Sequence, residues 1–316
     1  MRYILRADSS LKIGSGHVMR SSAIAEELIA RGEEVIFVGD CSEIPWLALR
    51  IDSLGFSQIL QTSREFIADS QTDVLILDSY TISVRDEFIQ RDRWRAIIAI
   101  VDESTPAYEA DLIIHLSLFK NQKPKSNSIF LTGPKYIPLR KSIKKRISQI
   151  KDKAAPVILV VGGGTDTFNF VEAICIELKK FEYQFHALIF SNKELLSQLD
   201  PRFTNVPMGS QLDVWATTAD LVFTTASTTC LEFIAREIPV GIGCAVDNQA
   251  EYYWFLSSTG LAMPIGRFRN HEWSLDQSKM ADLVRSSELR EVLRQKSAGM
   301  FDLKGTERIV DEILKL

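Results

Sequence analysis

Tyr3-Ile4-Leu5-Arg6-Ala7 leads into Asp8-Ser9-Ser10-Leu11-Lys12-Ile13-Gly14-Ser15-Gly16-His17, an apolar run of strand length followed by a polar loop that contains two glycines. The segment from His17 to Arg31 repeats apolar residues at helical spacing and stops at Gly32, a favourable C-terminal cap. A second apolar run follows at Glu34 to Val38. This order of strand, helix and strand predicts a βαβ unit within a parallel sheet.

The same alternation of strands and helices continues along the chain. Val74 to Leu77 ends at Asp78, and Ile97 to Val101 ends at Asp102, so both predicted strands carry a carboxylate where open α/β sheets bind ligands. In the second half of the chain the pattern restarts. We expect strands at 157–161, 185–190, 221–224 and 240–242, helices at 168–180 and 230–236, and a mainly helical tail over 287–316.

The fold class predicted from these patterns is α/β, with two Rossmann-like parallel-sheet domains that face a shared cleft. We expect an N-terminal domain over 1–138, a linker over 139–155, a C-terminal domain over 156–300 and a C-terminal helix over 301–316 that could cross both domains. The linker is rich in Lys and Arg, and because the whole chain is acidic we interpret it as a solvated interdomain helix.

Composition and charge narrow the class of ligand. The chain has 316 residues, 46% of them hydrophobic and 25% charged, with a net charge of −4, and it carries no polybasic arm, which argues against a nucleic-acid partner. No apolar stretch is long enough to cross a bilayer, and the four cysteines lack metal or redox spacing. We therefore expect a cytoplasmic, monomeric protein with reduced core cysteines, a small-molecule ligand and no membrane association.

His17 is the strongest candidate for catalysis. It follows Gly16 at the start of a predicted helix and lies outside the apolar stripe of that helix. The positive end of a helix disfavours imidazolium, so a neutral imidazole there is suited to act as a general base near neutral pH. A histidine that only caps or packs the helix fits the same position.

The glycine pair Gly14 and Gly16 invites comparison with dinucleotide-binding loops. Such a loop places its first glycine directly after the strand and a small residue at the position of Met19, which this chain does not do. Asp40 does follow the second strand, where a ribose-binding acid would lie, so dinucleotide binding remains an alternative.

Two further loops resemble ligand-binding turns. Gly162-Gly163-Gly164-Thr165-Asp166 joins a buried strand to a helix, but it lacks the lysine of a phosphate-binding P-loop. Thr224 to Thr229 brings small hydroxyl residues to a helix start, with Glu232 one turn further. Amides there could hold a diphosphate and Glu232 could accept from ribose hydroxyls. Asn248 and Gln249, just past a strand, could bind a ligand or close a turn.

Taken together, these segments resemble the sugar-nucleotide hydrolases of pseudaminic acid biosynthesis, relatives of the glycosyltransferase-B (GT-B) fold. The resemblance is carried, in the family's order, by Arg6-Ala7-Asp8-Ser9, Ile13 to Arg20, Asp78-Ser79-Tyr80, Gly163 to Asp166 with Asn169, Ala226-Ser227 with Glu232, and Asn248-Gln249.

The resemblance implies an enzyme that releases UDP from UDP-2,4-diacetamido-2,4,6-trideoxy-β-L-altrose, or a related UDP-amino sugar, by attack of water at the anomeric carbon, with no metal and no cofactor. His17 matches the catalytic base. The residues expected to bind the sugar are Asp8, Gly14, Gly16, Arg20, Asp78, Tyr80, Asn248 and Gln249. Those expected to bind the nucleotide are Gly163, Gly164, Thr165, Asp166, Ser227, Thr228, Thr229 and Glu232.

Two positions depart from the family's pattern: Ser79 stands where relatives usually carry histidine, and Leu231 stands where relatives often carry a polar or aromatic residue before the Glu. The sugar could therefore differ from the family's substrate. Two other functions also fit the residues: a glycosyltransferase of the same fold, in which His17 would deprotonate an acceptor hydroxyl, and a nucleotide-sugar-binding or dinucleotide-binding protein without turnover.

Overall fold

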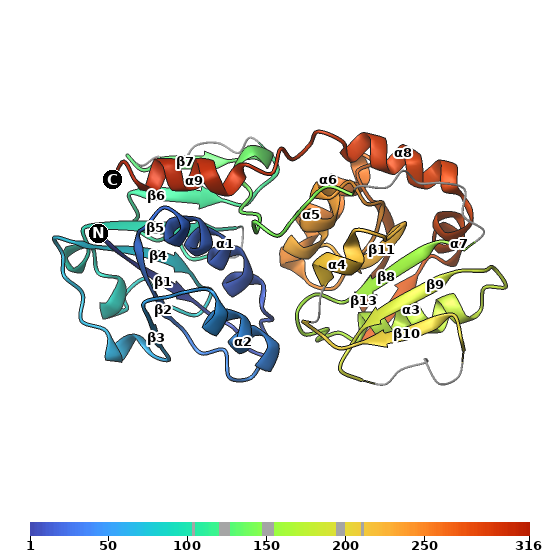
Figure 1. The fold of residues 1–316 in the computed structure, drawn as a ribbon, viewed down its shortest axis with the longest axis horizontal. Coiled ribbons are helices and arrows are strands. Elements are labelled where there is room, and N and C mark those ends of the chain that lie inside the picture. The colour runs from blue at the N-terminus through green and yellow to red at the C-terminus, as the bar shows by residue number, and fades with distance from the viewer. Residues whose placement is uncertain (103–104, 120–126, 147–154, 194–199, 210–211) are drawn as a thin grey trace. The chain divides into compact units, whose positions relative to one another are not determined.

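The computed structural model describes residues 1–102, 105–119, 127–146, 155–193, 200–209 and 212–316. Contacts between Cα atoms divide the chain into two compact units. Unit 1 comprises Met1–Lys141 with Asp302–Leu316, and unit 2 comprises Ser142–Phe301. Each unit is built on its own sheet, so the predicted pair of α/β sheets is confirmed (Figure 1). The prediction that they face one cleft concerns the placement of the units and stays a prediction.

Unit 1 contains, within the described residues, a seven-stranded parallel sheet in the order β3-β2-β1-β4-β5-β6-β7. Its strands are β1 (Arg2–Ala7), β2 (Glu34–Val38), β3 (Gln58–Leu60), β4 (Asp73–Asp78), β5 (Ala96–Val101), β6 (Leu112–His115) and β7 (Ile129–Thr132). Its α-helices are α1 (Gly16–Ala30), α2 (Pro45–Ser53) and α9 (Gly305–Ile313). The order reverses between β1 and β4, and at such a point the loops leave a crevice at the carboxyl ends of the strands.

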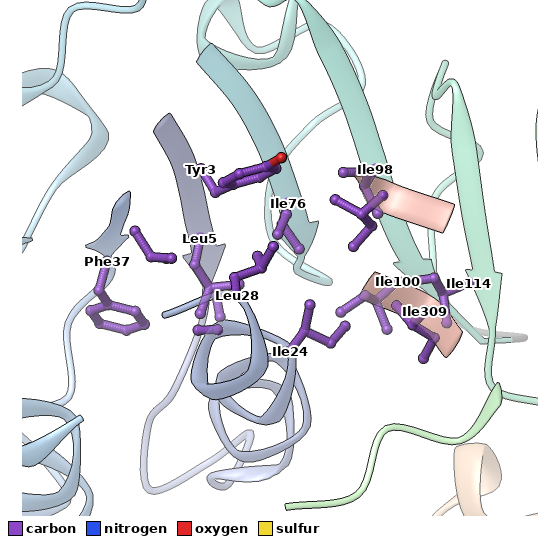
Figure 2. Packing of buried hydrophobic residues seen from close by; sticks show 14 of the residues in the cluster. Tyr3, Leu5, Ile24, Leu28, Phe37, Ile76, Ile98, Ile100, Ile114 and Ile309 are labelled. Carbon is purple, nitrogen blue, oxygen red and sulfur yellow. The ribbon is translucent and has the colours of Figure 1, made fainter. Parts of the chain in front are cut away.

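One face of this sheet is covered by helices from the two ends of the chain. Ile24 and Leu28 of α1 and Ile309 of α9 pack against Leu5, Ile76 and other residues of the strands (Figure 2). Helix α1 ends where Gly32, at a φ of 86°, accepts the left-handed backbone that closes the last turn. The opposite face is covered by residues of the connecting segments, such as Phe66, Trp94 and, in the short 3-10 helix Glu87–Ile89, Phe88.

Unit 2 contains a second seven-stranded sheet in the described part of the chain, in the order β10-β9-β8-β11-β12-β13-β14. Its strands are β8 (Val157–Val161), β9 (His186–Phe190), β10 (Phe203–Val206), β11 (Leu221–Thr225), β12 (Val240–Cys244), β13 (Met263–Arg269) and β14 (Glu272–Leu275). Its α-helices are α3 (Phe170–Lys179), α4 (Leu212–Ala216), α5 (Thr228–Ala235), α6 (Ala250–Ser258), α7 (Gln277–Arg285) and α8 (Ser287–Ser297). All strand pairs are parallel except β13 with β14.

The linker and the tail differ from expectation. Of the predicted linker, 147–154 lies outside the described residues, and 139–146 contains no helix. The Arg140 side chain is buried, and that of Arg146 is buried in an ion pair with Asp220, whereas Lys141, Lys144 and Lys145 are exposed. Within 139–146 the expectation of a helix is therefore wrong, and the expectation of solvation holds for the lysines. The tail forms α8 within unit 2 and α9 within unit 1. All four cysteines are buried and free of disulfides, as expected of core cysteines.

Candidate active site

The strand reversal of unit 1 brings His17 and Asp78 together. His17 lies in the first turn of α1, directly after the loop from β1, and Asp78 is the last residue of the adjacent strand β4. The loop is shaped by Gly14, which has a φ of 82° and whose N–H donates to the Ser10 carbonyl oxygen. His17 Nδ1 lies 2.5 Å from Asp78 Oδ1, and the two side chains are 4% and 0% exposed.

This contact fixes the tautomer of the imidazole. Because an ionised carboxylate only accepts hydrogen bonds, we assign the proton to Nδ1, which then donates to Asp78 Oδ1; Arg20 Nη2 lies 3.1 Å from the same nitrogen. In the neutral ring Nε2 is then left with a lone pair. The described part of the chain provides no hydrogen-bond partner for Nε2. His17 thus has the arrangement of a general base: Asp78 orients the ring through Nδ1, and Nε2 is the nitrogen that can take a proton.

Arg20 completes a buried cluster of charge with this pair. It lies three residues after His17 on the same face of α1, and its Nε and Nη2 donate to Asp78 Oδ2 and Oδ1 at 2.7 and 2.6 Å. Burial opposes ionisation of Asp78, but the charges and hydrogen bonds of Arg20 and His17 hold the pKa of its carboxyl below the ordinary value. Asp78 therefore remains a carboxylate that can stabilise imidazolium.

These contacts define what Asp78 and Arg20 can do. Both were expected to bind the sugar, yet both oxygens of Asp78 are occupied by protein donors and the residue is fully buried. Only 8% of Arg20 is exposed. The geometry makes them partners of His17, a role that the sequence did not reveal.

Tyr80 lies beside the imidazole. The two rings meet edge to face, with centroids 4.2 Å apart and an interplanar angle of 89°. The Tyr80 hydroxyl donates to Asp102, which follows β5. Tyr80 is partly exposed, so its ring can still meet a ligand.

Asp8 is held by three neighbours at the end of β1. Arg6 Nη1 lies 2.6 Å from its Oδ1, and the hydroxyls of Ser79 and Thr81 both donate to Oδ2. Ser79 is fully buried, and its hydroxyl also accepts from the backbone N–H of Thr81 and Ile82. Ser79 therefore fixes Asp8 and the turn after β4.

In unit 2, the predicted nucleotide residues follow neighbouring strands. The order of the sheet reverses between β8 and β11, and the Gly163 loop follows β8 while Ser227 follows β11. A Cβ on Gly163 would lie 4.0 Å from Thr225 Oγ1, so the two loops are close to each other. Gly163 has a φ of 87°, a conformation that favours glycine.

Helices α3 and α5 of unit 2 follow the carboxyl ends of β8 and β11. Thr228 and Thr229 open α5 after Ser227, so first-turn N–H groups point toward the edge of the sheet. Asp166 Oδ1 accepts from the N–H of Phe170 at 2.9 Å, which caps α3, and burial raises the pKa of Asp166 to about 6.

The other residues of unit 2 that were expected to bind ligand differ in exposure and in hydrogen bonding. Gly164 and Thr165 are partly exposed in the loop after β8, as is Glu232 in α5. Gln249 closes a turn by accepting from Ala245 N–H at 2.8 Å, and Asn248 beside it is exposed.

Asp40, the acid of the dinucleotide alternative, is exposed and accepts from the N–H of Ser42 at 2.8 Å. Among the described residues, no cluster of three or more His, Cys, Asp and Glu is arranged to hold a metal ion. In the same residues no helix is long and apolar enough to span a membrane.

Comparison with solved structures assigns the fold. The chain aligns with Acinetobacter baumannii MurG over 100% of its length and 99% of that chain, with a TM-score of 0.66 and 17% identity. With Arabidopsis thaliana UGT89C1 complexed with UDP-L-rhamnose, the coverage is 99% and 98%, the TM-score 0.69 and the identity 13%. The chain has the GT-B fold.

Sequence comparison gives more distant links. No family model matches the chain. It is 25% identical over 283 residues to an uncharacterized protein of Methanocaldococcus jannaschii, which covers 80% of this chain but only 57% of that protein. It is 24% identical over 207 residues to the UDP-2,4-diacetamido-2,4,6-trideoxy-beta-L-altropyranose hydrolase of Campylobacter jejuni, covering 62% of this chain and 72% of that enzyme.

Proposed function

We propose that this protein is a hydrolase that releases UDP from a UDP-amino sugar, with UDP-2,4-diacetamido-2,4,6-trideoxy-β-L-altrose as the first candidate substrate. The observation that carries the proposal is the His17–Asp78 contact, because it leaves His17 Nε2 as a base at the strand reversal of unit 1. The 24% identity to a hydrolase of that substrate supports the choice of sugar.

In the proposed reaction a water molecule attacks the anomeric carbon of the sugar. His17 Nε2 takes one proton of the water as the new C–O bond forms, and Asp78 stabilises the resulting imidazolium. The bond between the anomeric carbon and the pyrophosphate oxygen breaks, and UDP leaves with the electron pair. The free sugar and UDP are the two products.

Unit 2 is proposed to bind the leaving nucleotide. The backbone N–H groups at the start of α5 and in the Gly163 loop follow adjacent strands and suit the charge of a diphosphate. Because pyrophosphate leaves readily when its charge is held by donors, the reaction does not require a strong general acid. Glu232 is proposed to accept from the ribose hydroxyls.

Unit 1 is proposed to bind the sugar through the partly exposed Tyr80 and the loop from Gly14 to Gly16. Asp8 sits beside this loop and is oriented by Ser79. Since Ser79 is fully buried, a sugar contact that a histidine makes at this position would be absent. We therefore expect the substrate range to be decided by Asp8, Tyr80 and Thr81, with a related UDP-amino sugar as the alternative substrate.

The test is to incubate the purified protein with the UDP-linked diacetamido sugar and no acceptor, and to follow UDP release by chromatography. We expect one UDP and one free sugar per substrate consumed. Other UDP-amino sugars, assayed in parallel, rank the substrates. No release from any of them, with tight UDP binding retained, would refute hydrolysis.

A glycosyltransferase is the second candidate, favoured by the match to solved glycosyltransferase structures over the whole chain. In that case His17 would deprotonate a sugar hydroxyl in place of water. The same assay separates the two functions. UDP release that depends on an added acceptor, with the sugar recovered on that acceptor, identifies transfer.

A further inference from the structure

A second carboxylate, Asp102, lies next to the His17–Asp78 pair at the carboxyl end of β5. Its Oδ2 accepts from the Tyr80 hydroxyl and lies 3.6 Å from Arg20 Nη1. Its Oδ1 accepts from the Thr105 hydroxyl at 3.1 Å, and its own N–H donates back to that hydroxyl at 2.9 Å. Asp102 is thus fixed by its own loop and in turn contacts two neighbours of His17.

Each of these neighbours restricts the imidazole in a different way. Tyr80 packs its ring at 89° against the ring of His17, so a shift of Tyr80 removes the wall that limits rotation of the imidazole. Arg20 holds both oxygens of Asp78, so a shift of Arg20 changes the position of the carboxylate that receives Nδ1–H. Asp102 is the group that both neighbours share.

We propose that Asp102 is a positioning residue that fixes His17 through Tyr80 and Arg20. It makes no contact with His17 itself in the described structure and is not assigned a part in binding the substrate. Its effect on the imidazole exists in the protein without ligand. Only the kinetic part of its test rests on the proposed hydrolysis.

The charged groups around His17 show how a substitution of Asp102 reaches the imidazole. The groups that face the cluster are Asp78 from β4, Arg20 from α1, Tyr80 from the turn after β4 and Asp102 from the loop after β5. Asp8, in its ion pair with Arg6, lies at the neighbouring end of β1. Removing the charge of Asp102 leaves the cation of Arg20 less compensated, so the expected change reaches the imidazole through Arg20 and its contacts with Asp78.

The experiment compares Asp102→Asn and Tyr80→Phe with the wild-type protein, free of ligand. The imidazole resonance of His17, assigned by its loss in His17→Asn, is compared by NMR at one pH. For Asp102→Asn we expect the His17 resonance to shift and to broaden or split, because Tyr80 and Arg20 both lose a contact that holds them beside the imidazole. We also expect kcat to fall about tenfold, with KM within about twofold of wild type.

Tyr80→Phe keeps the ring but loses the bond to Asp102, and it tests the proposal even if Asp102→Asn does not fold. Its His17 resonance should broaden or split as the ring contact loosens. Because both variants break the same bond, their effects on kcat should be strongly non-additive in the double variant.

Asp311→Asn is the matched control, because Asp311 is also a carboxylate of unit 1 paired with an arginine, at 2.5 Å from Arg31. It should leave the His17 resonance unchanged. The proposal is overturned if neither Asp102→Asn nor Tyr80→Phe alters the His17 resonance, or if Asp311→Asn shifts it as much as Asp102→Asn. A shifted resonance in a protein that hydrolyses no UDP-sugar would refute the proposed function and leave the positioning role intact.

Discussion

At the scale of single residues, His17→Asn tests the base directly. We expect UDP release to fall by at least about 100-fold, because asparagine cannot take a proton from water. UDP affinity, measured by calorimetry, should remain within about twofold of wild type if nucleotide binding lies in unit 2, as proposed. Retained turnover would show that another group activates the water.

Asp78→Asn tests whether the buried carboxylate supports His17. We expect kcat to fall at least about 100-fold, because the amide no longer stabilises imidazolium and leaves Arg20 without its charged partner. Asp73→Asn is the control: Asp73 lies at the other end of β4, is equally buried, and pairs with Arg2.

Both variants should lower the midpoint of thermal unfolding, but only Asp78→Asn should lose turnover. Equal loss of kcat in the two folded variants would mean that Asp78 acts through stability alone.

The site could be predicted only in part from the sequence. His17 was found because it follows a glycine at a helix start, and Asp78 because it ends an apolar run. Their contact joins residues 61 positions apart and depends on β1 and β4 being neighbours in the sheet, which local patterns do not encode. Asp102 was visible only as a polar group at a strand end.

At the scale of elements, the caps of α3 and α7 predict opposite pH dependences. Asp166 caps α3 with a pKa raised by burial to about 6, so the folded state binds this proton more tightly than the unfolded state. Its contribution to stability is present at low pH and is lost as the pH rises through about 6. Asp276 caps α7 with a pKa lowered mainly by the Lys279 N–H, so its contribution is lost as the pH falls.

Urea unfolding at pH 5 and pH 7 measures this difference. In the wild-type protein, ionisation of Asp166 should make the free energy of unfolding smaller at pH 7 than at pH 5. In Asp166→Asn this decrease should be smaller, because asparagine does not ionise. Asp276→Asn keeps a capping group, and the difference between its free energies of unfolding at pH 5 and pH 7 should stay close to that of the wild type. An unchanged pH dependence in Asp166→Asn would contradict the raised pKa.

The strands of the two sheets were predictable where apolar runs are continuous, because strands covered on both faces read as unbroken hydrophobic segments. The short strands β3, β6, β7 and β10, of three or four residues each, were not predicted. Met263–Arg269 and Glu272–Leu275 were missed as well. They form a hairpin closed by Asn270 and His271, both with positive φ, and asparagine at the first of these positions is a recognisable turn signal. The hairpin is partly exposed, so its apolar residues do not form a continuous run.

At the scale of the whole molecule, α9 is part of the core of unit 1. Ile309 is fully buried against the sheet, so Ile309→Ala should lower the stability of unit 1 by about 2–5 kcal/mol. Hydrogen exchange followed by mass spectrometry should accelerate in β1 and α1 and stay unchanged in β8 and β11.

Ile174→Ala, in the equally buried core of α3, is the matched control and should give the reverse pattern. Uniform acceleration across both units in either variant would show that the units unfold as one.

The division into two units could be predicted because the alternation of strands and helices restarts near Val157. The return of the last residues to unit 1 could not, because an apolar stripe does not by itself specify which core a helix packs against. Its assignment depends on the hydrophobic face that α1 leaves beside β5 and β6, where Ile100, Ile114 and Ile309 meet (Figure 2).

This placement of α9 has a consequence for the newly made chain. Residues 142–301 are all synthesised before α9, so every segment of unit 2 is available while unit 1 still lacks a helix that covers its sheet. The apolar face beside β5 and β6 therefore stays uncovered by α9 until the whole second unit has been synthesised. On the ribosome we expect unit 2 to mature first, and the half-covered sheet of unit 1 to be the surface that chaperones protect.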